Sequence, residues 1–156
     1  MSDFGPLFQL SLNDLYEKLK HDLERMKSNP TSAFPAFDFF VTAYHMLEWH
    51  PGYRKSVVRN EVVAAYPELA VCEHIATGAK HYCVRDPEKK SVERTYIGSF
   101  SFEFSEEFDT VPLRIRLKGD AERALGSHIE ALDLATLLMR FWRDELTSYA
   151  SDLAEL

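Results

Sequence analysis

The sequence has few of the features that would place it in several common classes of protein. Its only cysteines, Cys72 and Cys83, are too few for a disulfide-stapled scaffold. No apolar run approaches the roughly 18 residues of a membrane span. The first residues lack the basic and apolar regions of a secretion signal. We therefore expect a cytoplasmic protein with reduced thiols and no contact with a membrane.

The sequence also lacks the fingerprints of common catalytic and cofactor sites. It has no nucleophile elbow and no dinucleotide-binding glycine pattern. The segment T-G-A-K at residues 77–80 lacks the glycines and the Ser or Thr of a phosphate-binding loop. We expect no bound cofactor.

Length and charge are informative in a different way. With 156 residues and 46% apolar content, the chain is expected to form one domain, residues 1–156, with a real core. The net charge is −7, and residues 120–156 hold eight acidic but only three basic side chains. An acidic surface repels phosphate backbones, so general nucleic-acid binding is disfavoured. Residues 53–94 hold eight bases and six acids, and could offer a local basic face.

Apolar residues recur at helical spacing in the first half of the chain. They predict an amphipathic helix over residues 12–27, which starts at a capping box of Ser11 and Asp14. Ser32 is expected to cap a second helix, which ends near Trp49 and is apolar almost all round, as expected of a helix at the centre of a bundle. Residues 53–65 predict a short basic helix, and Pro67 to Gly78 another, with the glycine as its cap.

The pattern changes to alternation in the second half. Residues 81–85, 92–104 and 111–118 predict three strands. A last helix is expected to begin at Asp120, with a break at Gly126-Ser127 because an unbroken helix would exceed the length of the domain. The predicted fold is α+β: a mainly helical bundle of four or five helices, with a small antiparallel three-stranded sheet inserted before the long C-terminal helix.

A polar stripe interrupts the apolar second helix. Asp38, Thr42, His45 and Trp49 share one face, and Glu48 lies beside them. Buried polar groups must find hydrogen-bond partners, so this stripe needs either a chemical or a structural reason.

Two further residues complete a candidate binding site. We expect His81 to meet His45 inside the molecule, with Lys80 placed to neutralise an anion. A carboxylate such as Glu48 near an imidazole favours proton transfer. The alternative is a structural cluster that fastens the strands to the second helix and fixes a unique packing.

The cysteines and two histidines suggest a metal site only superficially. Cys72-x-His74 and His81-x-Cys83 are four zinc-competent ligands. Residues two apart on a helix point about 200° away from each other, which makes the first pair poor joint ligands. We expect no metal, and keep a metal-dependent enzyme as an alternative.

A second alternative is a nuclease. Arg123-A-L-G-S-His128 resembles the Arg-x4–6-His motif of HEPN ribonucleases. In that family the histidine acts on the ribose hydroxyl and the arginine stabilises phosphate charge. Ala124 stands where the family usually has a polar residue, and ten arginines and six histidines give roughly one such match by chance. The helix count also resembles HEPN bundles, which is a weak basis for function.

Three segments carry a more specific resemblance. A-Y-H-M-L-E-W at residues 43–49, H-I-A-T-G-A-K-H-Y at 74–82 and K-K-S-V at 89–92 resemble a group of uncharacterised bacterial proteins, many of them from mobile elements. The resemblance covers residues 37–100 and implies an accessory protein, without naming an activity. Thr77 stands where the group has Asn. The shared positions are Asp38, His45, Trp49, His74, Lys80 and His81.

Because no catalytic set exceeds chance, we expect a non-enzymatic accessory or regulatory protein. It would act through protein–protein contacts and form a homodimer, with the acidic last helix and the basic middle segment as candidate surfaces.

Overall fold

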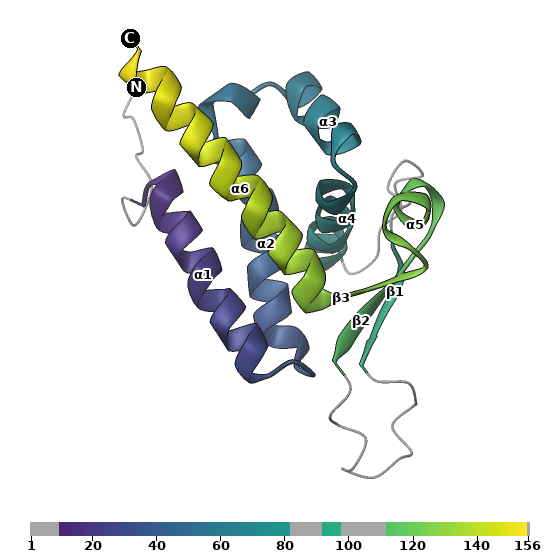
Figure 1. Cartoon of the computed structure of the whole chain (residues 1–156). Helices are drawn as coiled ribbons and strands as arrows, with labels where there is room; N and C mark the ends of the chain where they lie inside the picture. The colour runs from purple at the N-terminus through teal and green to yellow at the C-terminus, as the bar shows by residue number, and fades with distance from the viewer. Residues whose placement is uncertain (1–9, 82–91, 98–111, 156) are drawn as a thin grey trace.

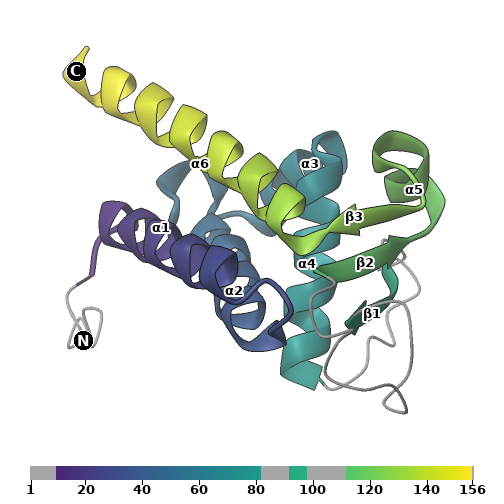
Figure 2. The same cartoon turned by 60° about the horizontal axis from the view of Figure 1, so that its bottom comes forward.

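The computed structural model describes residues 10–81, 92–97 and 112–155. Helices form most of it, and a small antiparallel sheet lies at one end (Figure 1, Figure 2). In chain order the elements are α1 (Leu12–Ser28), α2 (Ala33–Trp49), the 3₁₀ turn η1 (Pro51–Tyr53), α3 (Ser56–Ala65), α4 (Pro67–His81), β1 (Val92–Ile97), β2 (Leu113–Leu117), α5 (Gly119–Leu125), β3 (His128–Glu130) and α6 (Ala131–Ala154). The mainly helical α+β prediction is confirmed.

The first two helices begin at the predicted caps. The Ser11 hydroxyl accepts a hydrogen bond from the backbone N–H of Asp14 at 3.1 Å, and the Asp14 carboxylate accepts one from the backbone N–H of Ser11 at 2.7 Å. Ser32 caps α2 through the N–H of Phe34. Each cap satisfies backbone donors that the first helical turn leaves without partners.

The end of α4 differs from the prediction. Gly78 does not end this helix, which continues to His81. A glycine inside a helix costs about 1 kcal/mol relative to alanine, which tertiary contacts can offset. The strand predicted from His81 is therefore wrong at that residue, and 82–85 lie outside the described residues.

The sheet does not consist of the three predicted strands. Strand β2 is central in the order β1-β2-β3, and both of its neighbours are antiparallel to it. The segments 92–97 and 113–117 form strands within predicted ranges, while residues 98–104 lie outside the described part of the chain. The strand on the other side of β2 is His128–Glu130, a three-residue segment too short to show alternation in the sequence.

The predicted last helix is two helices, which raises the count to six α-helices in the described chain. Asp120 does not cap it: α5 begins at Gly119, with Lys118 as the cap residue. Gly126 has φ of 92° and ends α5, in a region that favours glycine. The predicted break at Gly126-Ser127 is confirmed, but α6 begins only at Ala131, after β3.

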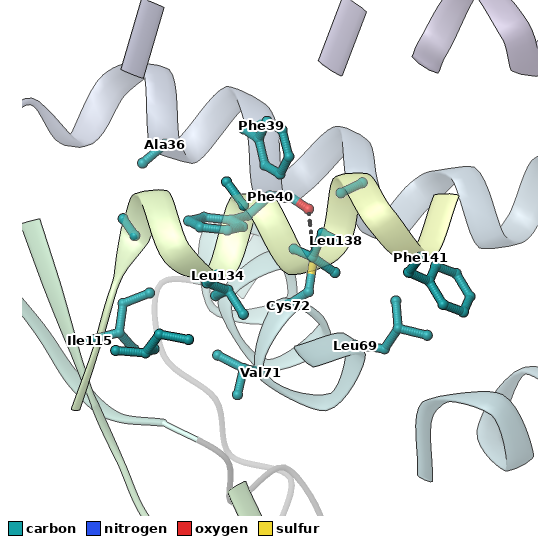
Figure 3. Packing of buried hydrophobic residues seen from close by; sticks show 14 of the residues in the cluster. Ala36, Phe39, Phe40, Leu69, Val71, Cys72, Ile115, Leu134, Leu138 and Phe141 are labelled. Carbon is teal, nitrogen blue, oxygen red and sulfur yellow. Dashed lines mark hydrogen bonds between the residues drawn. The ribbon is translucent and has the colours of Figure 1, made fainter. Parts of the chain in front are cut away.

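The core lies where α6 crosses α2 and α4, and it extends to the sheet. Figure 3 shows Leu134 and Leu138 of α6 among side chains of α2, α4 and β2. Trp142 is fully buried, and its indole N–H donates to the Ala43 carbonyl at 3.0 Å. Burying a leucine contributes about 1.5–3 kcal/mol, so these contacts are the main source of stability. No helix in the described ranges has the length and apolar character needed to cross a bilayer.

Candidate functional site

The polar stripe on α2 is divided between two environments. Its first half faces α1. The Asp38 carboxylate accepts a hydrogen bond from the Arg25 guanidinium at 2.8 Å, and the Thr42 hydroxyl accepts one from the Lys18 ammonium at 3.0 Å. These contacts hold α1 against α2, so this half of the stripe has a structural role.

A buried carboxylate that the sequence reasoning missed organises the same contact. Asp22 is 2% exposed and is ion-paired to both Lys18 and Arg25. The hydrogen bonds to Asp38 and to Asp22 raise the pKa of Arg25. One signal could have revealed this residue: Asp22 follows Leu19 by three positions and precedes Met26 by four, which places an acidic residue on the apolar face of α1.

The second half of the stripe is more open. The His45 Nδ1–H donates to the Val41 carbonyl at 2.8 Å, which leaves Nε2 as the acceptor of the neutral ring. Glu48 is exposed, and Trp49 is 40% exposed. Trp49 therefore offers part of a large apolar side chain to solvent at the end of α2.

Tyr44 links this region to α4. Its hydroxyl donates to Glu73 Oε1 at 3.2 Å, and its ring meets His45 edge-on, with 5.7 Å between ring centroids. Burial, reinforced by the negative charge of Glu73, raises the pKa of Tyr44. Tyr44 is thus a neutral hydrogen-bond donor at physiological pH. Lys80 and His81 end α4, but their side chains lie outside the described residues, so the expected meeting of His45 and His81 stays a prediction.

Cys72 and His74 serve separate contacts. The Cys72 thiol is fully buried and donates to the Phe40 carbonyl at 3.2 Å (Figure 3). Burial raises the pKa of this thiol, which disfavours the thiolate that a metal would need. His74 Nδ1 accepts from the Val92 N–H at 3.2 Å and so connects α4 to β1. Within the described ranges no three His, Cys, Asp or Glu side chains are grouped to hold a metal ion; Cys83 lies outside them.

The two residues of the nuclease-like motif lie on different elements, and neither is on the long helix α6. Arg123 lies on α5 and is ion-paired to Asp120, whereas His128 lies on β3. His128 Nδ1 is 2.9 Å from the Ser127 hydroxyl. His128 also lines a groove of about 640 Å³, whose other lining residues are Arg114, Ala124, Leu125, Ile129, Glu130, Asp133 and Leu137. Arg123 is not part of that lining.

Two phenylalanines at the start of α2 correct the expectation of a fully enclosed helix. Phe34 is 80% exposed and Phe37 is 49% exposed. They are one turn apart and therefore share a face, which half-buried Val41 continues. We call Phe34, Phe37 and Val41 the aromatic face. The sequence of α2 is apolar on nearly all sides of the helix. It therefore does not indicate which side the other elements leave exposed.

His50, the residue that follows α2, is a second residue whose role the sequence reasoning missed. It is 6% exposed, and its Nδ1 accepts from the Gly52 N–H at 3.1 Å. The ring stacks on Tyr53 at 4.5 Å between centroids, and the Tyr53 hydroxyl donates to Glu145 Oε2 at 2.5 Å. Burial lowers the pKa of His50, although the charge of Glu145 opposes this effect. Its Nε2 is buried with no hydrogen-bond partner among the described residues.

Comparison of the chain with protein-family models, curated proteins and solved structures found no match. The resemblance to the bacterial group and to HEPN bundles therefore stays a prediction.

Proposed function

We propose that this chain is a non-enzymatic accessory or regulatory protein, which binds another protein through the aromatic face of α2. The observation that carries the proposal is the exposure of Phe34 and Phe37, at 80% and 49%, on a helix whose opposite side is fully buried. Large exposed aromatic side chains that share one face are typical of protein-binding surfaces.

The size of this face gives an expected energy. A phenylalanine presents roughly 200 Å² of surface, so the two rings leave roughly 250 Å² uncovered. Burying that area would contribute about 6 kcal/mol before the entropic costs of association. This is enough for two dominant contacts in an interface, each worth about 2 kcal/mol or more.

The shape of the face indicates the partner. Phe34, Phe37 and Val41 follow the i, i+3, i+7 spacing of one apolar stripe along α2. An amphipathic helix of another protein can pack against such a stripe. We therefore take the partner to be a protein that presents an apolar helical face.

The test compares three tagged proteins in cells that naturally express the chain. They are the wild type, the double variant that carries both Phe34→Glu and Phe37→Glu, and the single variant Val57→Glu. Val57 is 66% exposed on α3, away from α2, and is a matched control for adding a charge at an exposed apolar position. Cross-linking and mass spectrometry should recover a protein with the wild type and the control, and lose it with the double variant. Recovery unaffected by the double variant would contradict the proposal.

The ribonuclease alternative has less support. Arg123 is paired with Asp120 on α5, and the groove that contains His128 also contains the carboxylates of Glu130 and Asp133, which repel phosphate. An RNA cleavage assay on the purified protein tests this alternative. Cleavage by the wild type that is lost in Arg123→Ala and also in His128→Ala would favour a nuclease over a binding protein.

A further inference from the structure

One buried histidine fastens the connection between α2 and α3 to α6. His50 follows α2 directly and is 6% exposed. Its ring stacks on Tyr53 of η1 and lies beside Trp142 and Tyr149 of α6, with centroid distances of 4.5, 6.3 and 5.2 Å. Both views show this connection next to α6 (Figure 1, Figure 2). The imidazole is therefore at the centre of an aromatic cluster that joins η1 to α6.

The hydrogen bonds of the ring fix its protonation state. Nδ1 of His50 accepts from the backbone N–H of Gly52 at 3.1 Å, so this nitrogen carries no proton. The proton of the neutral ring is then on Nε2, which is buried and has no acceptor among the described residues. Gly52 also fits closely, because a Cβ at this position would lie 3.1 Å from both Nδ1 and Cε1 of the ring. The neutral ring and the turn thus hold each other in place.

A second proton on this ring is incompatible with the same arrangement. An imidazolium carries a proton on both nitrogens and accepts no hydrogen bond. Protonation turns Nδ1 into a donor that faces the Gly52 N–H, so the hydrogen bond to the turn is lost. Neither ring N–H then has an acceptor in the described part of the chain. Because buried donors without acceptors are costly, the charged ring can no longer hold the turn in this position.

The charged and titratable groups around the ring act in opposite directions. The Glu145 carboxylate of α6 favours the imidazolium, but it already accepts from the Tyr53 hydroxyl at 2.5 Å. Arg59 of α3 donates to the Tyr53 carbonyl at 2.9 Å and so places a positive charge on the other side of η1. Tyr149 of α6 contributes an aromatic ring. Burial outweighs the effect of Glu145 and holds the pKa of His50 below its ordinary value.

The elements that the ring fastens have few other buried contacts. All ten residues of α3 are described by the structure, and Val63 is the only buried one among them. The Arg59 side chain ties α3 to η1, since it donates to the carbonyls of Tyr53 and Arg54 at 2.9 and 2.7 Å. Segments with few buried apolar side chains open at a lower free energy than the core does. η1 and α3 therefore form a segment that can open while the core stays folded.

We infer that His50 is a pH-sensitive latch: the neutral ring fastens η1 and α3 to α6, and protonation of the ring releases them. Acidification opens residues 51–65 locally, while α1, α2 and α6 keep their packing. The opening uncovers the rings of Trp142 and Tyr149 on α6. The latch is separate from the aromatic face of α2, so it can hold or fail independently of the proposed protein binding.

The size of the effect follows from the titration of the ring in the two states. In the open segment His50 has its ordinary pKa of 6.5. If the closed form bound no second proton, opening would be favoured about tenfold more at pH 5.5 than at pH 7.5. Because Glu145 permits some protonation of the closed form, we expect an increase of about three- to tenfold.

Hydrogen exchange measured by mass spectrometry on the full chain tests the latch. After correction for intrinsic rates, amides of residues 52–65 should exchange about three- to tenfold faster at pH 5.5 than at pH 7.5. The amides of α1 should change less than about twofold. His50→Asn keeps an acceptor for the Gly52 N–H but does not titrate, so it should abolish the difference. His21→Asn is the matched control, because His21 is exposed on α1, and it should respond as the wild type does.

A second variant distinguishes the latch from general destabilisation. Glu145→Gln keeps an acceptor for the Tyr53 hydroxyl but removes the charge that favours the imidazolium. Its response to pH should therefore approach the full increase of about tenfold. Circular dichroism at pH 7.5 checks that each variant keeps its helices. A response of His50→Asn equal to that of the wild type, an equal loss of protection in every helix, or a smaller response of Glu145→Gln would overturn the inference.

Discussion

Replacing Asp22 with asparagine removes a negative charge from a side chain that is 2% exposed, while leaving its volume almost unchanged. The carboxylate pairs with Lys18 and with Arg25, and Arg25 also pairs with Asp38, so the change weakens the whole contact between α1 and α2. A hydrogen bond to a charged group contributes about 1.5–3 kcal/mol. Lys18 and Arg25 are 44% and 41% exposed and can rehydrate, which reduces the net effect.

We therefore expect Asp22→Asn to lower the free energy of unfolding by about 1–2 kcal/mol, or Tm by about 2–8 °C for a chain of this length. Urea unfolding followed by circular dichroism measures it. Glu17→Gln is the control, because Glu17 forms an ion pair with Lys20 that is exposed on both sides. When Asp22→Asn and Arg25→Ala are combined, the loss in free energy of unfolding should differ from the sum of the two single losses. The reasoning is refuted if Asp22→Asn unfolds like the control, or if the two changes add independently.

Two further predictions concern buried titratable groups. Burial holds the pKa of His50 below its ordinary value of 6.5. At pH values near 6.5 the unfolded state therefore binds more protons than the folded state. The free energy of unfolding should therefore fall as pH decreases from 7.5 to 5.5. His50→Asn, which keeps an acceptor for the Gly52 N–H, should flatten that dependence; urea titrations that show equal slopes for both proteins would contradict it. Cys72 is fully buried and its pKa is raised, so in a Cys83→Ser background a thiol reagent should label it only after denaturation. Rapid labelling of the folded protein would show that the thiol is accessible.

The sequence predicts the regular parts of this fold well, for identifiable reasons. Ser11 and Ser32 precede long apolar-periodic segments, and both are observed helix caps. Strand β2 alternates between buried Leu113, Ile115 and Leu117 and the outward Arg114 and Arg116, as a strand with one buried face requires. These elements depend on local pattern alone.

The elements that the sequence does not predict depend on contacts between distant segments. Strand β3 is three residues long and exists because Ile129 pairs with Ile115 of β2. Helix α4 continues past Gly78, since a glycine inside a helix costs only about 1 kcal/mol relative to alanine and does not by itself end a helix.

The candidate site shows the same division. The need of Asp38 for a partner is evident from the sequence, whereas the identity of Arg25 as that partner is not. The exposure of Phe34 depends on which sides of α2 the other helices cover, which periodicity does not encode.

The central claim is that the aromatic face of α2 binds another protein. The most direct test is the recovery of a cross-linked partner by the wild type, by Phe34→Glu with Phe37→Glu, and by the Val57→Glu control. The account predicts a partner that is retained by the first and the third proteins and lost from the second. Equal recovery by all three would contradict it.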